Sequence, residues 1–478
     1  MTEENLIHDK AESIRDVIRY LRRFKNALVI IYIDDKLLDS PLFTNHIKDI
    51  CRIHEAGLKV IVVPGANKRI NEILEKSGIE WSFHKDYRIT KPEAMPLIKM
   101  AAFDVSNQIM TALAGEKTNA VIGNWVRARG KGIIDGFDYG TTGEIDKLQV
   151  DAIENILANG FVPIFPCIGW RLAGKPYNIS SIQLAEQIAV HLKADKLFYL
   201  IPGASISAES FKVPDGIGTS PEGNIPAMNL EEVDEFLKAN KIPTNKQSVN
   251  SNSETAEHSV VSSVPENVSR EKIFLLLQLA KEACNSGVTR VHILNGSLDG
   301  TIPCEIFSDL GSGTMIYYNN YGGIRAMTRD DIPGVLNVMK PFISAGILLP
   351  RTRAGLLEEF QHYIVYELDG AIRACASLIP YDDGQMEIAG VAVNKTFSHV
   401  GIGPKLVKYL VKQAVKLNAK SVFLLTTQTA DWFENLGFYA DDISTLPEAR
   451  KAKWTSSRGS KVLRYDLNSV SRETEFKS

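Results

Sequence analysis

Two glycines at alternate positions, Gly401 and Gly403, form a turn that is suited to holding phosphate groups. The turn, HVGIGP (399–404), directly follows an apolar segment and opens a helix. Glycines allow successive backbone N–H groups to point into one hollow, and the helix N-terminus adds partial positive charge. Pro404 falls in the first helical turn, where a missing N–H causes no loss. A pyrophosphate is the expected ligand, although a plain tight turn has the same pattern.

The elements around this turn predict an α+β domain. A β-hairpin is expected over 362–380, because Asp369-Gly370 is among the strongest turn signals between two strands. A third strand, 386–393, leads into the glycine turn and its helix. The domain is completed by a strand at 421–427, a helix at 431–436 and a last strand near 461–467.

Earlier in the chain, apolar β-branched strands alternate with helices. The expected strands are 27–33, 58–65, 119–123, 161–169 and 194–203. Buried apolar strands separated by helices predict an α/β sandwich with a mostly parallel sheet. The polar, Ser/Asn-rich region within 204–270 lacks periodicity, so that segment is expected to be a disordered insertion.

The first 25 residues are expected to include an amphipathic helix. Its apolar face carries Ile14, Val17, Ile18 and Leu21. Such a helix packs either on its own domain or on a neighbouring subunit. The predicted organisation is therefore an N-terminal helix at 1–25, an α/β domain at 26–322 and an α+β domain at 323–478.

Composition narrows the classes of partner. With 478 residues the chain needs more than one hydrophobic core. Its net charge of −3 gives no reason to expect nucleic acid or an anionic membrane. The five cysteines are dispersed and have no metal-binding spacing, which favours reduced thiols in the cytoplasm and no metal. The start of the chain lacks the apolar run of a signal peptide.

The segment GVAVNKTFSHVGIGPKLVKYLVKQA resembles the acetyl-CoA-binding region of the GCN5-related N-acetyltransferases. It departs from them at Ser398, where most members have Arg or Gln. The resemblance implies that acetyl-CoA is bound by backbone groups, and that an N–H near Val391 faces the thioester oxygen, where negative charge develops. The implied cofactor-binding residues are Val391, Ala392, Val393, Val400, Gly401, Ile402 and Gly403.

A closer resemblance, over 324–467, is to the acetyltransferase domain of bacterial N-acetylglutamate synthases. It is carried by GILLPRTRAGLLEE, DGAIRACASLIPYDDGQMEIAGVAV, FLLTTQTADWFENLGF and SSRGSKVLRYDL. It implies that Glu387 takes a proton from the substrate amine and that Ser460 protonates the leaving thiolate. Arg351 and Arg458 would each bind a carboxylate of L-glutamate. Arg353 is an alternative to Arg351, and Glu387 has the alternative of a solvent-facing strand acid.

Residues 27–322 resemble the amino-acid kinase fold, as in acetylglutamate kinase. The matching segments are KDYRITKPEAM, ARGKGIIDGFDYGTTGEI, YNISSIQLAEQIAVHLKADKLFYL, GVTRVHIL and EIFSDLGSGTMI. The lysine expected after the first strand is absent, and Asp34 and Asp35 stand there, which would repel ATP. In the synthases this domain is an allosteric module for arginine. The implied arginine-binding residues are Tyr20, His292, Glu305, Gly311 and Gly313.

Three hypotheses follow from these resemblances. The first is an amino-acid N-acetyltransferase that moves acetyl from acetyl-CoA to L-glutamate, the first step of arginine biosynthesis, with arginine as inhibitor. The second is an acetylglutamate kinase with a regulatory acetyltransferase-like tail, and the third is a non-catalytic arginine sensor. The resemblance also implies a homo-oligomer.

Overall fold

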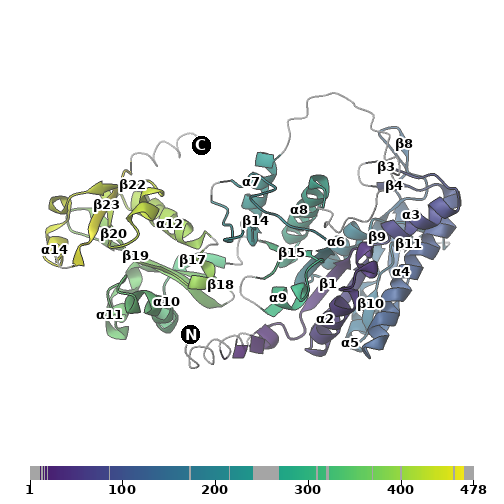
Figure 1. The fold of residues 1–478 in the computed structure, drawn as a ribbon, viewed down its shortest axis with the longest axis horizontal. Helices are drawn as coiled ribbons and strands as arrows, with labels where there is room; N and C mark the ends of the chain where they lie inside the picture. Colours follow the sequence, from purple (N-terminus) through teal and green to yellow (C-terminus); the bar gives the residue numbers. More distant parts are fainter. Residues whose placement is uncertain are drawn as a thin grey trace. The chain divides into compact units, whose positions relative to one another are not determined.

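The chain forms two compact units in the computed structural model (Figure 1). One comprises Met1–Pro214 and Glu222–Tyr318, and the other comprises Asp215–Pro221 and Asn319–Ser478. The residues that the structure describes are 11, 14–15, 17–18, 20–84, 87–171, 174–214, 216–240, 268–307, 311–318, 322–368, 370–398, 401–455 and 458–467.

An eight-stranded sheet forms the centre of the first unit. Its strand order is β14-β16-β15-β13-β1-β2-β10-β5. All neighbours run parallel except β15 and β16, which are antiparallel. The strands are β1 (Leu28–Ile33), β2 (Lys59–Pro64), β5 (Ala120–Ile122), β10 (Val162–Ile164), β13 (Lys196–Ile201), β14 (Ala227–Asn229), β15 (Arg290–Asn295) and β16 (Thr314–Tyr317).

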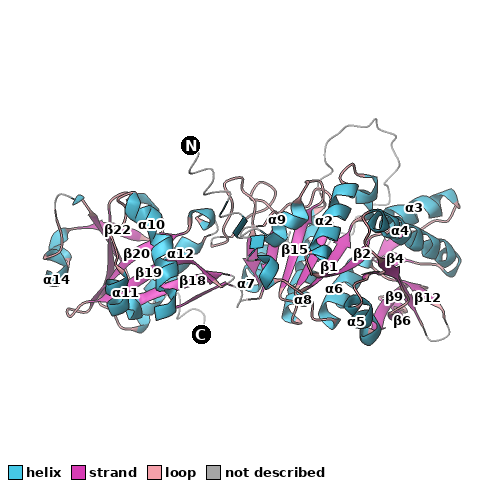
Figure 2. Ribbon diagram, turned by 90° about the horizontal axis from the view of Figure 1, so that it is seen from below, coloured by secondary structure: helices cyan, strands magenta, loops and turns pink. Residues whose placement is uncertain are grey.

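Helices cover both faces of this sheet, as Figure 2 shows for α2 (Phe43–Glu55) and α6 (Ser181–His191). Val29 and Ile31 of β1 share a buried cluster with residues of α2, α4 (Met95–Gly115) and α9 (Thr301–Phe307). On the opposite face the Tyr199 hydroxyl donates to the carbonyl of Ile182 in α6. The predicted α/β sandwich with a mostly parallel sheet is confirmed. The remaining helices of this unit are α3 (Asn67–Lys76), α5 (Val150–Ala158), α7 (Leu230–Asn240) and α8 (Arg270–Asn285).

Short antiparallel elements in this unit were not predicted. The expected strand 161–169 divides into β10 and β11 (Ile168–Trp170), and β11 belongs to a second sheet of order β12-β11-β6-β9. These strands are only three to six residues long, too short for a periodic pattern. Their partners and the two small hairpins are β12 (Pro176–Asn178), β6 (Val126–Gly130), β9 (Gly143–Leu148), β3 (Ser82–His84), β4 (Tyr87–Ile89), β7 (Ile133–Ile134) and β8 (Phe137–Asp138).

The expectation of a disordered insertion is wrong for residues 204–240. This segment includes β14, which pairs with β16 at the edge of the large sheet, and the helix α7. Val233 and Phe236 of α7 are fully buried. The i, i+3 spacing of these apolar side chains gives the helix a face to pack, although the surrounding composition is polar. The rest of the expected insertion, 241–267, lies outside the described residues.

The expected N-terminal helix is present in part. Tyr20 and Phe24 are buried against the first unit, and their rings stack with centroids 5.9 Å apart. Ile14, Val17 and Ile18 are instead exposed. Among the helices of the described residues, none is long and apolar enough to cross a membrane.

The second unit contains a seven-stranded sheet of order β17-β18-β19-β20-β21-β23-β22. All neighbours are antiparallel except β20 and β21, which run parallel. The strands are β17 (Gly322–Ala326), β18 (Tyr363–Leu368), β19 (Ala371–Pro380), β20 (Gln385–Val393), β21 (Ser421–Thr426), β22 (Phe438–Asp441) and β23 (Lys461–Tyr465).

Helices lie on both faces of this sheet, with α12 (Ile402–Lys416) on one side and α10 (Ile332–Ser344) on the other (Figure 1). Val335 and Met339 of α10 pack on Cys375 and Ala392 of the central strands. The predicted α+β architecture is confirmed. The shorter helices are α11 (Arg353–Glu359), α13 (Ala430–Glu434) and α14 (Glu448–Lys451).

Candidate active site

The two parallel strands at the centre of the second unit separate partway along their length. β20 pairs with β21 only over Gln385–Glu387 and Ser421–Phe423. Opposite β19, the register shifts by one residue between Cys375 and Ser377, which is a β-bulge in β20. Gly390 lies in this bulge with φ +61°, a conformation that few other residues adopt. The pairing of the two strands therefore ends at Glu387, and Val391, Ala392 and Val393 belong to the part of β20 that is separated from β21.

The predicted phosphate-binding turn lies at the start of α12. Gly401 is the N-cap residue, with φ +73° and no side-chain hydrogen bond to the helix. A methyl group at Gly403 would lie 3.0 Å from the ring of Trp432 and 3.7 Å from Val393 Cγ2, so the turn packs closely on both. Ile402 and Gly403 begin the helix, whereas Val400 lies outside the described residues. The backbone N–H groups of this first turn have no partners within the helix and form a candidate anion-binding position.

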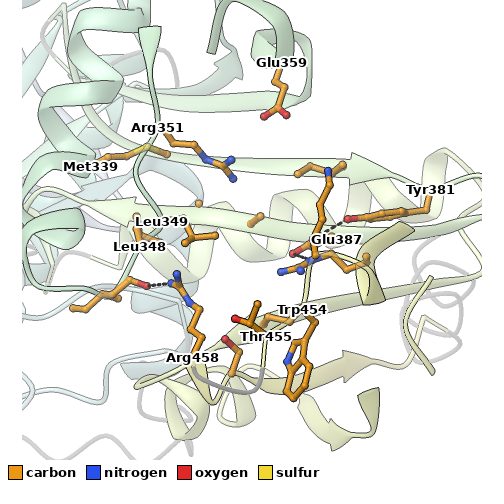
Figure 3. Close-up of a pocket in the computed structure, with 18 residues that line it drawn as sticks. Met339, Leu348, Leu349, Arg351, Glu359, Tyr381, Glu387, Trp454, Thr455 and Arg458 are labelled. Atoms are coloured by element: carbon orange, nitrogen blue, oxygen red, sulfur yellow. Dashed lines mark hydrogen bonds and ion pairs between the residues drawn. The ribbon is translucent and has the colours of Figure 1, made fainter. Parts of the chain in front are cut away.

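A cavity of about 230 Å³ lies beside Glu387 (Figure 3). Its lining brings together the four predicted catalytic and substrate-binding residues, Glu387, Ser460, Arg351 and Arg458. Arg353, the alternative to Arg351, is the first residue of α11 and does not line the cavity. The lining segments are far apart in the sequence, from α10 to the loop after α14.

Glu387 is held by two neighbouring side chains. Only 5% of the residue is exposed. Its Oε2 accepts a hydrogen bond from the Tyr381 hydroxyl at 2.7 Å, and both carboxylate oxygens lie 3.0 Å from Arg450 Nε. Burial and then the Glu387 charge raise the pKa of Tyr381, so this hydroxyl stays protonated and donates. Glu387 is therefore not a solvent-facing strand acid.

The charges around the cavity favour an anionic ligand. Four cationic side chains line it, and two carboxylates, Glu359 and Glu387, oppose them. One Nη of Arg458 donates to the Ile347 carbonyl at 3.0 Å, which fixes the guanidinium at the wall. Our sequence interpretation missed Arg450, because α14 is a four-residue helix without a periodic pattern. The cations are Arg351, Arg450, Lys453 and Arg458.

In the first unit, most of the predicted arginine-binding residues meet at one buried carboxylate. His292 Nδ1 lies 2.6 Å from Glu305 Oε1, and Glu305 Oε2 accepts from the backbone N–H groups of Ser312 and Gly313. Gly311 has φ +65°, and a side chain there would collide with the Glu305 carboxylate. Burial lowers the pKa of His292 to about 4. Burial opposes ionisation of Glu305, but the contact with His292 and the hydrogen bonds from the Ser312 and Gly313 backbone together lower the pKa of Glu305.

Tyr20, the fifth predicted residue, connects to this group through aromatic rings. Its ring stacks on Phe24, and both belong to the same buried cluster as Phe198. Phe198 in turn packs edge-on against His292, with ring centroids 4.8 Å apart. The structure thus places the N-terminal helix in the packing network of the Glu305 site.

A carboxylate of the chain itself caps the start of α3. Asp35 Oδ2 accepts from the backbone N–H groups of Lys68 and Arg69 at the start of α3. Asp34 pairs with Lys272 Nζ at 2.8 Å. Burial and then the charge of Asp34 raise the pKa of Asp35. An anion bound to these two N–H groups would compete with Asp35.

The fold and the site define a class: an amino-acid kinase-like unit joined to an N-acetyltransferase unit. Residues 28–203 match the amino acid kinase family, and residues 340–439 match the acetyltransferase (GNAT) family. Amino-acid acetyltransferases are similar over nearly the whole chain. That of Actinobacillus pleuropneumoniae serotype 7 is 31% identical, covering 94% of this chain and 96% of the relative, and that of Photobacterium profundum is 30% identical, covering 95% and 97%.

The chain belongs to the amino-acid acetyltransferases and is an acyltransferase. The crystal structure of N-acetylglutamate synthase from Neisseria gonorrhoeae with coenzyme A and L-arginine has a TM-score of 0.72 and 26% identity, covering 96% of this chain and 99% of that chain. The same enzyme with coenzyme A and N-acetyl-glutamate has a TM-score of 0.56 over the same coverage. The predicted family resemblance is confirmed.

Proposed function

We propose that the chain transfers the acetyl group of acetyl-CoA to the α-amine of L-glutamate. The observation that carries this proposal is the cavity in which Glu387 lies among four cations. L-Glutamate has two carboxylates and one ammonium group, and it needs cationic partners and a proton acceptor in one place. The similar synthase from Neisseria gonorrhoeae was crystallised with coenzyme A and with N-acetyl-glutamate, which supports the same substrates here.

In this proposal Arg351 and Arg458 each bind one carboxylate of the acceptor. Glu387 takes a proton from the ammonium group, directly or through one water. The amine nitrogen then attacks the thioester carbonyl carbon, a C–N bond forms and the C–S bond breaks. The ammonium group loses two protons in all. Glu387 passes one of them to solvent. Ser460 gives its hydroxyl proton to the thiolate and regains a proton from the second. A backbone N–H near Val391 stabilises the charge on the thioester oxygen.

The co-substrate would bind beside the separated part of β20. Its pantetheine arm would lie along Val391, Ala392 and Val393, where β20 has separated from β21. Its pyrophosphate would bind backbone N–H groups from Val400 through Gly403, at the positive end of α12. Ser398, whose hydroxyl donates to the Lys395 carbonyl, is not needed for this contact.

The kinase-like unit would sense arginine rather than transfer phosphate. L-Arginine is bound in the similar Neisseria gonorrhoeae structure, and Glu305 is a buried carboxylate that can pair with a guanidinium. Its partners His292, the Ser312 hydroxyl and the backbone N–H groups of Ser312 and Gly313 would have to share it with the ligand. Against the kinase hypothesis, Asp35 takes the N–H groups at the start of α3 that a phosphate would need.

The proposal includes a homo-oligomeric assembly and a cytoplasmic location. The exposed apolar residues Ile14, Val17 and Ile18 on the N-terminal helix support a homo-oligomer in which this helix packs on a neighbouring subunit. All five cysteines are free thiols, and four of them are buried, which supports a reducing, cytoplasmic location.

The test is release of CoA thiol by the purified full-length protein across a panel of amino acids, with and without arginine. We expect release with L-glutamate, and less release when arginine is added. Release with another amine but not with glutamate would overturn the substrate assignment. ATP consumption with N-acetylglutamate would favour the kinase hypothesis. Calorimetry that found arginine binding without acetyl-CoA binding would favour the sensor hypothesis.

A further inference from the structure

We infer that Arg450 is a positioning residue that keeps the Glu387 carboxylate aimed into the cavity. This inference rests on the proposed function, because it assigns Arg450 a role through the proposed base. Arg450 lies 63 residues after Glu387 in the chain, yet its Nε is 3.0 Å from both carboxylate oxygens. The two side chains are 16% and 7% exposed, so water screens the pair only weakly.

The loop before α14 fixes the position of Arg450. Leu446, which is 2% exposed, shares a buried cluster with Phe423 and Val462. Phe423 lies opposite Glu387 in the register of β20 and β21. The backbone N–H of Arg450 donates to the Pro447 carbonyl, which closes the first turn of the helix. The same packing that anchors the loop therefore places the guanidinium beside the carboxylate.

The hydrogen bonds of Glu387 leave one acceptor position of its carboxylate available for the substrate. Its Oε2 accepts from both Tyr381 and Arg450, whereas Oε1 accepts only from Arg450 among the described residues. A carboxylate oxygen has two acceptor positions, so one position on Oε1 remains for the ammonium group or a bridging water. The guanidinium and the hydroxyl together hold the carboxylate plane, which limits its rotation away from the substrate.

Arg450 is also the cation of the cavity that contacts Glu387 directly. The other charged groups that line the cavity are Arg351, Glu359, Lys453 and Arg458. Among the described cations of this lining, Arg450 is the one that donates a hydrogen bond to Glu387.

The test compares Arg450→Ala and Arg450→Lys with the unaltered full-length protein. CoA release from acetyl-CoA and L-glutamate is measured to give kcat and the KM of each substrate. We expect Arg450→Ala to lower kcat about tenfold or more, because the carboxylate is no longer held toward the substrate. KM for acetyl-CoA should stay the same, and Arg450→Lys should restore part of the lost kcat. If Arg450→Ala does not fold, Arg450→Gln replaces it.

Two comparisons decide between this role and a purely structural one. In a Glu387→Gln background, adding Arg450→Ala should change kcat by less than about threefold, because the two residues act as one unit. The matched control is Lys451→Ala, next along α14, whose recorded ion pair is with the exposed Glu448. An unchanged kcat in Arg450→Ala, or an equal loss in both backgrounds, would overturn the inference. If the unaltered protein does not use glutamate, the proposed function fails instead, and the same comparisons are made with the amine that it does use.

Discussion

Asp35 places its side-chain Oδ2 2.7 Å from the backbone nitrogen of Lys68, where helix α3 begins. The carboxylate thus supplies, from within the chain, the negative charge that helix N-termini favour. Asp35 therefore occupies backbone N–H groups that an anion at this helix start would otherwise bind.

Replacing Asp35 with alanine should destabilise the kinase-like unit without creating kinase activity. Loss of the helix cap is expected to cost about 1 kcal/mol, since two backbone N–H groups lose their partner. Thermal denaturation measures the effect, and CoA release with glutamate should change less than about twofold. Asp39→Ala, which removes an exposed carboxylate paired with the Lys68 side chain, is the control. Phosphorylation of N-acetylglutamate by either variant would contradict this account.

Glu387→Gln should lower turnover by about a hundredfold or more, because a neutral amide cannot accept the proton. Acetyl-CoA affinity should hardly change, since the proposed coenzyme contacts are backbone groups of β20 and α12. Stopped assays measure kcat, and calorimetry measures the affinity for acetyl-CoA, so the two effects can be separated. Glu434→Gln alters an exposed acid of α13 and should behave like the unaltered protein. A large loss of coenzyme affinity in Glu387→Gln would refute its assignment as the base.

Arg351→Ala and Arg458→Ala should each raise KM for L-glutamate by roughly tenfold or more, because a charge-assisted hydrogen bond is lost. Lysine at either position should restore only part of the affinity, since it cannot bind a carboxylate in fork geometry. Arg353→Ala is the matched control, because Arg353 lies two residues from Arg351 but outside the cavity lining. Kinetics at saturating acetyl-CoA measure these changes. A stronger effect from Arg353 than from Arg351 would reverse the assignment.

The kinase-like unit should lose stability as the pH falls from about 6.5 to about 4. Because burial lowers the pKa of His292 to about 4, the unfolded chain binds a proton in this window that the folded unit does not. The expected loss is about 2 kcal/mol. His292→Gln should flatten the dependence in this range, whereas exposed His191→Gln should not. Denaturant unfolding at several pH values provides the measurement, and an unchanged slope in His292→Gln would contradict the burial argument.

The sequence by itself determined the two fold classes, most of the long strands and helices, and the glycine turn before α12. These features depend on contiguous residues: apolar runs, the Asp369-Gly370 turn signal, and alternate glycines at a helix start. Family resemblance added Glu387, Arg351, Arg458 and Ser460, which the structure places around one cavity. Their individual roles stay predictions.

Only the tertiary structure decided what surrounds these residues. Arg450 and Tyr381 hold Glu387, β20 separates from β21, and Asp35 caps α3. Each of these features depends on residues that are distant in the chain or belong to different elements. Such contacts depend on strand order and register, which local periodicity does not encode. The order of α7 was missed because the polar composition of the surrounding segment concealed the i, i+3 spacing of Val233 and Phe236, which the tertiary structure buries completely.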